Sequence, residues 1–442
     1  MTASTTPGAV VDATVYTGGA WVPHQDILFV DGTVSEIRDH VPGTSGIDGS
    51  GAHVVPGFVN THTHLQQTLM RGVGEGLPLL TWLLSVAEDT VALTPEQAYL
   101  AAASGALEAL RSGTTTLVEH MWPSPSAELH DAVMRALEDV GVRVVFGRGV
   151  TDRVDATRKW GSDPRLVQPL DEALAHTDEL AARAAKGDGR ISMALAVPNP
   201  RCLTPEGMAA VRAFAEARDM TVSIHLLETT TDDDMCRAHT GLGAVDFLEA
   251  SGFLWDRLLA VHCVELSPEG MAKLAARGVA VSYNPVSNMR LGSGVAPVPA
   301  MLAAGLGVGL GVDGAASNDT QDMLESLRMG SYVQRAFHRR ADLLPAAEML
   351  DIAFSGANRV LGLPDSSGGV ALGAPADLTL VRFPRDFAVL PVRDPSASLL
   401  TTGTPRLVDT VLVGGEAVIV DGRSTRLDEA DLAARILALN PS

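Results

Sequence analysis

The chain has 442 residues, of which 46% are apolar and 19% charged. This length and composition describe a globular protein with a large core and room for a second, smaller domain, and they argue against a disordered chain. The formal net charge of -20 argues against binding to nucleic acid or to an anionic membrane, because no basic stripe offsets the repulsion between like charges.

Cysteine content and the N-terminus bear on where the protein works. Cys202, Cys236 and Cys263 are too few and too irregularly spaced for a disulfide framework or a thiolate zinc site, which fits a reducing cytoplasm. The first ten residues lack the basic region and apolar core of a secretory signal, and the apolar stretch 295–312 is interrupted by Pro and Gly. We therefore expect a cytoplasmic protein without a membrane span.

Short β-branched runs separated by turn signals characterise both ends of the chain. Asp31-Gly32 separates two such runs near the N-terminus, and Gly414-Gly415 divides another near the C-terminus. The strands predicted from these runs are 13–16, 26–30, 34–37, 376–381 and 409–420. Because both ends share the pattern, we predict one small β-sandwich domain built from residues 1–55 and 366–442.

Between the two ends, apolar strand-like runs alternate with longer segments of helical period. The predicted strands are 55–62, 115–120, 143–150, 191–197, 221–228, 258–264, 279–284 and 308–313. Several helices are expected to begin alike, with a hydroxyl at the N-cap and proline next, at Thr94, Thr204 and Ser267. Eight near-continuous apolar strands, each followed by a helix, predict an α/β fold with a (β/α)8 TIM-like barrel over residues 56–365.

His62 and His64 stand at the end of the first predicted barrel strand. Residues i and i+2 of a strand point to the same side, so both imidazoles can reach one ion. Polar residues end other predicted strands as well, where barrel enzymes place their catalytic groups. These residues are Glu119 and His120, His225 and Glu228, His262, and Asp313.

Three neutral imidazoles and one carboxylate suit a single divalent metal ion, Zn²⁺ or alternatively Fe²⁺. The predicted ligands are His62, His64, His225 and Asp313. The chain has no HExxH motif and no cysteine pair, which removes the common metalloprotease, zinc-finger and cytidine-deaminase alternatives.

The remaining polar strand ends predict the proton-transfer groups. Glu228 lies three residues after His225, within reach of a metal-activated water, and is predicted to act as general base and proton shuttle. Asp313 is expected to orient the attacking water in addition to binding the metal, and His262 to polarise the group under attack.

Several motifs in this order resemble the amidohydrolase superfamily, in its branch of mononuclear aminohydrolases. The motifs are Pro56-Gly57-Phe58-Val59-Asn60-Thr61-His62-Thr63-His64, Ser112-Gly113-Thr114-Thr115-Thr116, His225-Leu226-Leu227-Glu228, His262-Cys263-Val264, Asn284-Pro285-Val286-Ser287-Asn288 and Asp313-Gly314-Ala315-Ala316-Ser317-Asn318. The resemblance covers nearly the full length. Binuclear members need a carboxylated lysine after the fourth strand, and residues 191–200 contain no lysine, so we expect one metal per chain.

The resemblance implies hydrolytic deamination of an amino-substituted nitrogen heteroaromatic, with release of ammonia. The expected substrates are free bases of the guanine, 8-oxoguanine or pterin kind, or an s-triazine. An S-adenosylhomocysteine or adenosine-type deaminase, and a triazine hydrolase that displaces chloride, are the alternatives within the family. The alternative of another class is a noncatalytic metal- or ligand-binding barrel.

Substrate-binding residues are assigned from the resemblance alone. Gln67 matches a glutamine of similar 8-oxoguanine and isoxanthopterin deaminases, and His120 belongs to a segment like theirs at the end of the second strand. Trp82 and Arg148 match positions in S-adenosylhomocysteine deaminases. Asn199 stands where those nucleoside-type enzymes carry a histidine, which favours a free base. The expected partners are a small heteroaromatic substrate and, with no interface identified, further copies of the chain as a homodimer or larger assembly.

Overall fold

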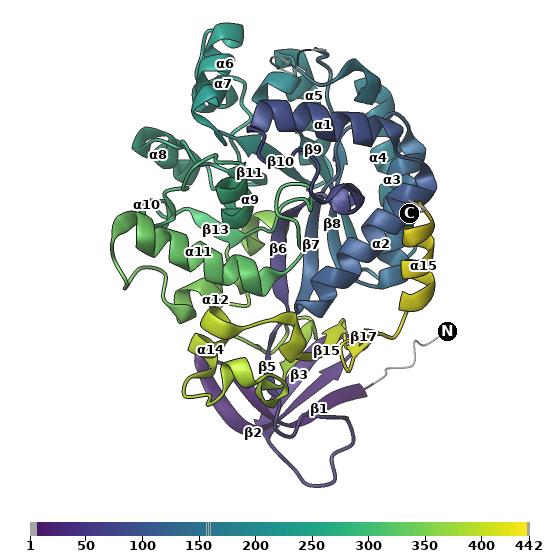
Figure 1. Cartoon of the computed structure of the whole chain (residues 1–442), viewed down its shortest axis with the longest axis vertical. Helices are drawn as coiled ribbons and strands as arrows, with labels where there is room; N and C mark the ends of the chain where they lie inside the picture. The colour runs from purple at the N-terminus through teal and green to yellow at the C-terminus, as the bar shows by residue number, and fades with distance from the viewer. Residues whose placement is uncertain (1–6, 156, 158, 160, 440–442) are drawn as a thin grey trace.

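The computed structural model describes residues 7–155, 157, 159 and 161–439. A barrel wrapped by helices stands beside a sheet to which both ends of the chain contribute (Figure 1). This arrangement confirms the predicted barrel with a small β unit made from the two termini. Residues 1–6, part of the stretch examined for a secretory signal, and 440–442 lie outside the described residues. The predicted domain boundaries stay a prediction.

Eight parallel strands follow one another around the barrel in chain order. Nearly all their residues are buried, because side chains fill the interior and helices cover the outside. The strands are β6 (Phe58–Thr63), β7 (Thr114–His120), β8 (Arg143–Gly149), β9 (Ile191–Val197), β10 (Thr221–Leu226), β11 (Leu258–His262), β12 (Ala280–Tyr283) and β13 (Gly307–Leu310).

Helices connect these strands and form the outer layer of the barrel (Figure 1). The α-helices are α1 (Leu79–Ala92), α2 (Pro95–Arg111), α3 (Ala127–Val140), α4 (Leu170–Ala184), α5 (Pro205–Glu216), α6 (Thr230–Thr240), α7 (Ala244–Ala250), α8 (Pro268–Ala276), α9 (Pro285–Arg290), α10 (Val298–Ala303), α11 (Met323–His338), α12 (Ala346–Ser355) and α13 (Asn358–Leu361). Short 3₁₀ turns are η1 (Leu65–Met70), η2 (Pro164–Leu166) and η3 (Pro200–Cys202).

Three helices begin as their sequences predict. The hydroxyls of Thr94, Thr204 and Ser267 accept hydrogen bonds from the backbone amides three residues later, at 3.2, 3.0 and 3.1 Å. Proline follows each of these caps at the first helical position of α2, α5 and α8. Each cap satisfies a backbone donor that would otherwise lack a partner.

The first and last barrel strands meet at the carboxyl end of the barrel. The backbone amide of Asp313 donates to the carbonyl of His62 at 2.8 Å, and that of Val312 donates to Oδ1 of Asn60 at 3.0 Å. These bonds lie beyond the end of β13 and tie its following loop to β6. Two of the predicted metal ligands are therefore held together by the backbone itself.

Backbone geometry divides one predicted strand and shortens several others. The predicted strand 55–62 is two strands, because β5 (His53–Pro56) pairs in the terminal sheet and Gly57 separates it from β6. A side chain at Gly57 would lie 2.0 Å from the hydroxyl of Thr115. β10 ends at Leu226 and β11 at His262 because the next residues, Leu227 and Cys263, both have a φ of 52°, which is incompatible with a strand. β13 ends at Leu310, three residues before Asp313.

The terminal sheet has nine strands connected by hydrogen bonds, in the order β17-β16-β15-β14-β5-β1-β2-β3, with β4 paired to β1. β1 is parallel to β4 and β5, and the other pairs are antiparallel. Its remaining strands are β1 (Pro7–Thr17), β2 (Ala20–Val30), β3 (Thr33–Asp39), β4 (Ile47–Asp48), β14 (Leu378–Val381), β15 (Val408–Val413), β16 (Glu416–Val420) and β17 (Arg423–Ser424). C-terminal helical segments are η4 (Phe383–Arg385), η5 (Phe387–Val389), α14 (Pro395–Thr402), η6 (Pro405–Leu407) and α15 (Glu429–Leu439).

An ion pair joins the barrel to this sheet. Arg143, the first residue of β8, donates from Nε and Nη2 to the two carboxylate oxygens of Asp377 at 2.6 and 3.0 Å. The amide of Gly414 also donates to Asp377, at 2.6 Å. Among the helices that the structure describes, none has both the length and the apolarity to cross a bilayer.

Candidate functional site

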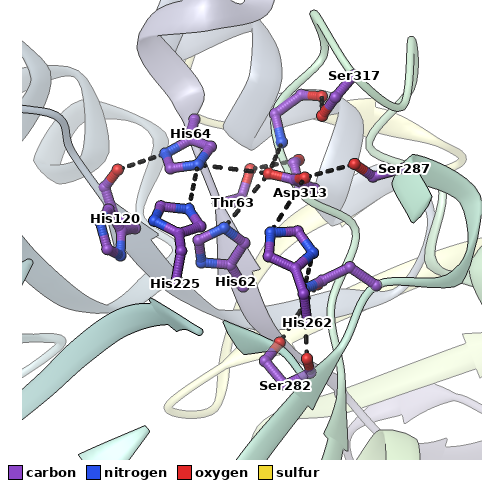
Figure 2. Close-up of polar contacts among 12 residues, drawn as sticks. His62, Thr63, His64, His120, His225, His262, Ser282, Ser287, Asp313 and Ser317 are labelled. Carbon is purple, nitrogen blue, oxygen red and sulfur yellow. Dashed lines mark hydrogen bonds and ion pairs between the residues drawn. The ribbon is translucent and has the colours of Figure 1, made fainter. Parts of the chain in front are cut away.

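The four predicted metal ligands face one small space at the carboxyl ends of the barrel strands (Figure 2). His62 lies on β6, His64 directly follows β6, His225 lies on β10, and Asp313 lies beyond β13. Oδ1 of Asp313 is 3.3 Å from Nε2 of His62 and 3.4 Å from Nε2 of His64. Nε2 of His225 is 3.3 Å from Nε2 of His64.

These separations fit ligands that surround a zinc-sized ion. Zinc binds nitrogen and oxygen ligands at about 2.0 to 2.1 Å in a tetrahedron, which places neighbouring ligand atoms about 3.3 to 3.4 Å apart. The three measured separations of 3.3, 3.4 and 3.3 Å all agree with that value. The donor set of imidazole nitrogens and one carboxylate oxygen also suits a divalent transition metal.

Hydrogen bonds on the far side of two rings orient their lone pairs toward this space. Nδ1 of His64 lies 2.5 Å from the carbonyl oxygen of His120, and Nδ1 of His225 lies 2.7 Å from that of Pro198. A carbonyl only accepts, so each Nδ1 carries the proton and each Nε2 keeps a lone pair. This is the arrangement that commonly orients metal-binding histidines.

His62 has no hydrogen-bond partner at either ring nitrogen, although it is completely buried. Burial lowers its pKa to about 3, so the ring is neutral and offers a lone pair at physiological pH. Buried polar atoms are seldom left without a partner, because their desolvation is then uncompensated. A bound cation would provide a partner for Nε2 of His62.

His120 forms a second possible grouping with His62 and His225, whose ligand atoms also lie within 4.8 Å of one another. Nδ1 of His120 lies 2.9 Å from the hydroxyl of Ser223, and its buried Nε2 has no partner. Its ring centroid is 4.4 Å from that of His225. His120 therefore faces the metal ligands from the barrel interior.

Asp313 is held in a fixed orientation at the centre of the site. Its Oδ1 accepts from the amide of Gly314 at 2.7 Å, and its Oδ2 accepts from the hydroxyl of Ser287 at 2.6 Å. Its φ of 71° is uncommon outside glycine, and such backbone conformations concentrate at functional sites. Oδ1 thus faces the histidine nitrogens while Oδ2 faces His262, from which it is 4.0 Å away.

His262 has the opposite tautomer from His64 and His225. Its Nδ1 faces two amide donors, Nδ2 of Asn288 at 2.9 Å and Nδ2 of Asn284 at 3.4 Å. The Asn284 amide is oriented by its bond to the carbonyl of Ser282, at 3.3 Å. Nδ1 of His262 therefore accepts, and its proton lies on Nε2. Burial lowers the pKa of His262 to about 4, so a neutral ring presents this N–H to the site.

Glu228 is buried beside this N–H. Its Oε2 is 3.6 Å from Nε2 of His262, and its Oε1 accepts from the hydroxyl of Ser293 at 3.3 Å. Burial and the nearby carboxylates of Asp313 and Asp232 raise its pKa well above the usual value for glutamate. A carboxyl group whose pKa is shifted upward toward neutrality suits proton transfer in both directions.

A cavity opens from the metal-ligand cluster toward the solvent. His64, His225, Glu228, His262 and Asp313 line its inner part. The rest of the wall is mainly apolar and comes largely from α1 and the loops that follow the barrel strands. It is formed by Leu79, Leu80, Trp82, Leu83, Trp122, Pro123, Ser162, Leu166, Pro198, Asn199, Pro200, Arg201, Leu227, Asp232, Ala244 and Leu291.

Of the five predicted substrate-binding residues, some line the cavity and others lie outside it. Trp82 and Asn199 line the cavity, whereas His120 faces the metal ligands. Gln67 is fully buried with no hydrogen-bond partner for its amide, in a position where its Oε1 would be 2.1 Å from a side chain at Gly314. Arg148 is not among the lining residues of this cavity; it donates to the carbonyl of Gly149 and to Gln168.

Several residues complete the site without having been assigned a role from the sequence. Asn284, Ser287 and Asn288 belong to one sequence motif at the start of α9. Their contacts are with His262 on β11 and with Asp313 beyond β13, which the motif alone does not indicate. Glu119 accepts from the amide of Leu65 at 2.9 Å and so holds the backbone next to His64. Glu119 could have been identified from the sequence as a polar residue near the end of a buried strand.

Comparisons with known proteins agree with this geometry. The model of the family described as "Amidohydrolase family" matches residues 53–418. The 8-oxoguanine deaminase of Pseudomonas aeruginosa is 36% identical over 89% of this chain and 88% of its own length. The 5-methylthioadenosine/S-adenosylhomocysteine deaminase of Desulforudis audaxviator is 35% identical over 94% of this chain and 92% of its own. The zinc complex of atrazine chlorohydrolase from Arthrobacter aurescens TC1 superposes with a TM-score of 0.90, at 26% identity over 98% of this chain and 99% of that one.

Proposed function

The chain belongs to the amidohydrolase family, and from this membership and the geometry of the site we propose that it is a metal-dependent aminohydrolase. It removes the amino group of a nitrogen heteroaromatic by hydrolysis and releases ammonia. The observation that carries the proposal is the cluster of His62, His64, His225 and Asp313 at ligand separations, with the buried carboxyl of Glu228 beside it.

Zinc is the proposed ion, held by Nε2 of the three histidines and Oδ1 of Asp313. The separations of these atoms and the imidazole-rich donor set favour Zn²⁺, with Fe²⁺ as the alternative. When bound, such an ion supplies a water nucleophile at neutral pH, because it lowers the pKa of a coordinated water to about 7.

Three side chains of this chain have separate roles in the proposed reaction. Glu228 takes a proton from the attacking water and delivers it to the substrate, so that a C–O bond forms, the C–N bond breaks and the leaving nitrogen departs as ammonia. Nε2–H of His262 donates to the ring atom that gains electron density. Asp313, fixed by Ser287 and Gly314, holds the nucleophile in line with the ring carbon.

The proposed substrates are free bases of the guanine, 8-oxoguanine or pterin kind, and s-triazines. The similarity to 8-oxoguanine deaminase supports the free base. The similarity to 5-methylthioadenosine/S-adenosylhomocysteine deaminase favours a nucleoside-type substrate as the second candidate, and that to atrazine chlorohydrolase favours displacement of chloride as the third.

Ammonia release from a panel of aminopurines, aminopterins and aminotriazines tests the proposed function. The metal-loaded protein is expected to release ammonia from at least one ring class, whereas metal-stripped protein releases none. Chloride release from chlorotriazines in the same panel distinguishes the third candidate. No product from any compound, with stoichiometric metal bound, would contradict the proposal.

A further inference from the structure

We propose that the outer part of the cavity is a subsite for an uncharged, apolar substituent on the heteroaromatic ring. This inference rests on the proposed function, and it names the chemical class of substrate that the site takes. It predicts that an alkyl group on the ring improves turnover, whereas a sugar or a carboxylate arm does not.

The apolar wall of the outer cavity belongs to a hydrophobic cluster separate from the main core. Buried side chains from α1, η2 and the loops after β7 and α9 pack together over the barrel mouth. Those that also line the cavity are Leu79, Trp82, Trp122, Leu166 and Leu291. Leu80, Leu83 and several prolines extend the same surface. A continuous apolar wall of this kind gains free energy when it contacts an apolar ligand group.

Trp82 shows how this surface is kept apolar. Its Nε1–H donates to the carbonyl of Ala316 at 3.1 Å, and the side chain is almost fully buried. The polar atom of the indole is therefore used inside the protein, and the ring contributes its carbon surface to the cavity wall.

Asp232 is the carboxylate of the outer wall, and its oxygens are already engaged. Its Oδ2 accepts from the backbone amides of Glu228 and Thr229 at 2.8 and 3.0 Å. Its Oδ1 pairs with Nη1 of Arg201 at 3.3 Å. A sugar diol is normally bound by an acceptor that is free to receive two hydroxyl hydrogens. Asp232 serves instead to cap α6 and to neutralise Arg201.

Arg201 is likewise committed to the protein. Besides Asp232, its Nε donates to the carbonyl of Lys159 at 2.9 Å. Its backbone amide is bound by Oδ1 of Asn199 at 3.0 Å. Arg201 is 5% exposed, so its guanidinium and the carboxylate of Asp232 form a buried ion pair with no net charge. A charged arm on the substrate would have to disrupt this pair, and a buried ion that loses its partner is costly.

A series of substrates that differ in one substituent tests the subsite. Five compounds are compared, all built on the ring that releases ammonia in the panel. At one ring position they carry hydrogen, methyl, n-propyl, 2-carboxyethyl or ribosyl. Burial of a methylene contributes about 0.8 kcal/mol, so kcat/KM is expected to rise about fourfold for each added methylene. The carboxyethyl and ribosyl compounds are expected to fall at least about tenfold below the n-propyl compound, because Asp232 and Arg201 are already paired with each other.

Two neighbouring leucines of α1 provide matched variants. Leu83 lines the cavity, whereas Leu84 is 45% exposed and does not. Leu83→Ala is expected to lower the ratio of kcat/KM for the n-propyl compound to that for the parent by a few fold. Leu84→Ala is expected to leave this ratio unchanged.

Binding of the same compounds to the metal-loaded Glu228→Gln protein, followed by calorimetry, separates the two proposals. Alkyl-dependent binding without ammonia from any wild-type reaction would support the subsite and contradict the proposed function. Ammonia release with no dependence on alkyl length, or with preference for the ribosyl or carboxyethyl compound, would overturn the subsite and leave the proposed function standing.

Discussion

Nδ2 of Asn288 lies 2.9 Å from Nδ1 of His262 and donates a hydrogen bond to it. Because Asn284 donates to the same nitrogen from 3.4 Å, the His262 proton is held on Nε2, which faces Glu228 and Asp313 at 3.6 and 4.0 Å. His64 and His225 have the reverse arrangement, with Nδ1 protonated. In the proposed reaction, these tautomers suit His64 and His225 to metal binding and His262 to hydrogen-bond donation.

Replacement of Asn288 by leucine tests this division. Leucine has a similar size but no N–H group, so Nδ1 of His262 no longer accepts its shorter hydrogen bond. The tautomer with the proton on Nε2 is then less strongly favoured over the tautomer with the proton on Nδ1. We expect kcat/KM to fall about 10- to 100-fold with metal content unchanged. Steady-state kinetics and ¹⁵N NMR of the histidine nitrogens measure the two effects.

Asn358→Leu is the control for Asn288→Leu. Asn358 is also buried but donates to Pro364 and Phe354 at the other end of the barrel. Its loss is expected to lower stability without changing the His262 spectrum. A wild-type His262 whose proton resides on Nδ1 would show that the amides do not set the tautomer.

Glu228→Gln tests the proton shuttle. Glutamine keeps the size and a polar head but cannot take a proton from water, so kcat is expected to fall about 10²- to 10⁴-fold, while the metal, which Glu228 does not bind, stays in place. Elemental analysis and ammonia release measure the two quantities. Glu265→Gln, on the exposed loop after β11, serves as control. A Glu228→Gln protein with kcat within a few fold of wild type would remove Glu228 from the reaction.

The two overlapping histidine groups are separated by a pair of variants. If His64 is a ligand, His64→Gln weakens metal binding by about 100-fold or more, whereas His120→Gln retains the metal and alters turnover instead. Competition with a chelator, followed by metal analysis, gives the relative affinities. Loss of metal from His120→Gln with retention by His64→Gln would favour the alternative group of His62, His120 and His225.

Buried histidines away from the metal site make stability depend on pH. Burial, and then the nearby Arg148 and His176, lower the pKa of His130 well below 6.5. Below about pH 6.5 the unfolded chain therefore binds a proton at this position that the folded protein does not, and the free energy of unfolding falls as the pH falls. His130→Leu is expected to reduce this slope by up to about 1.4 kcal/mol per pH unit.

Urea unfolding at several values between pH 5 and 7.5 measures the effect. Leu129→Ala, a buried and non-titrating position on the same helix, is expected to lower the free energy of unfolding by a similar amount at every pH. If the free energy of unfolding depended equally on pH in the wild type and in His130→Leu, the lowered pKa of His130 would not be a source of this dependence.

Periodicity and capping residues were sufficient to predict the barrel and its helix starts. Apolar runs of strand length alternate regularly along the chain, and the caps at Thr94, Thr204 and Ser267 act within four residues of themselves. Strand ends were harder to predict, because no local sequence signal marks the positive φ values of Leu227 and Asp313. The division of the first run at Gly57 depends on contact with Thr115 from another strand.

The site shows the same distinction between local and long-range signals. His62, His64, His225 and Asp313 were predictable because polar residues at the ends of buried strands are unusual, and the structure brings them together. The roles of Asn288 and Ser287 depend on bonds to His262 and Asp313 across 26 residues each, which spacing alone does not reveal. Arg148 was assigned by resemblance, but in the structure it donates to Gly149 and Gln168 and does not line the cavity.

Metal titration of ammonia release tests the central claim most directly. Metal-stripped protein is supplied with increasing equivalents of Zn²⁺, and the rate of ammonia release is measured with the best compound of the panel. The account predicts a linear rise from zero to a plateau at one equivalent per chain. Activity that is independent of metal, or that requires two equivalents to saturate, would contradict a single ion held by three histidines and one aspartate.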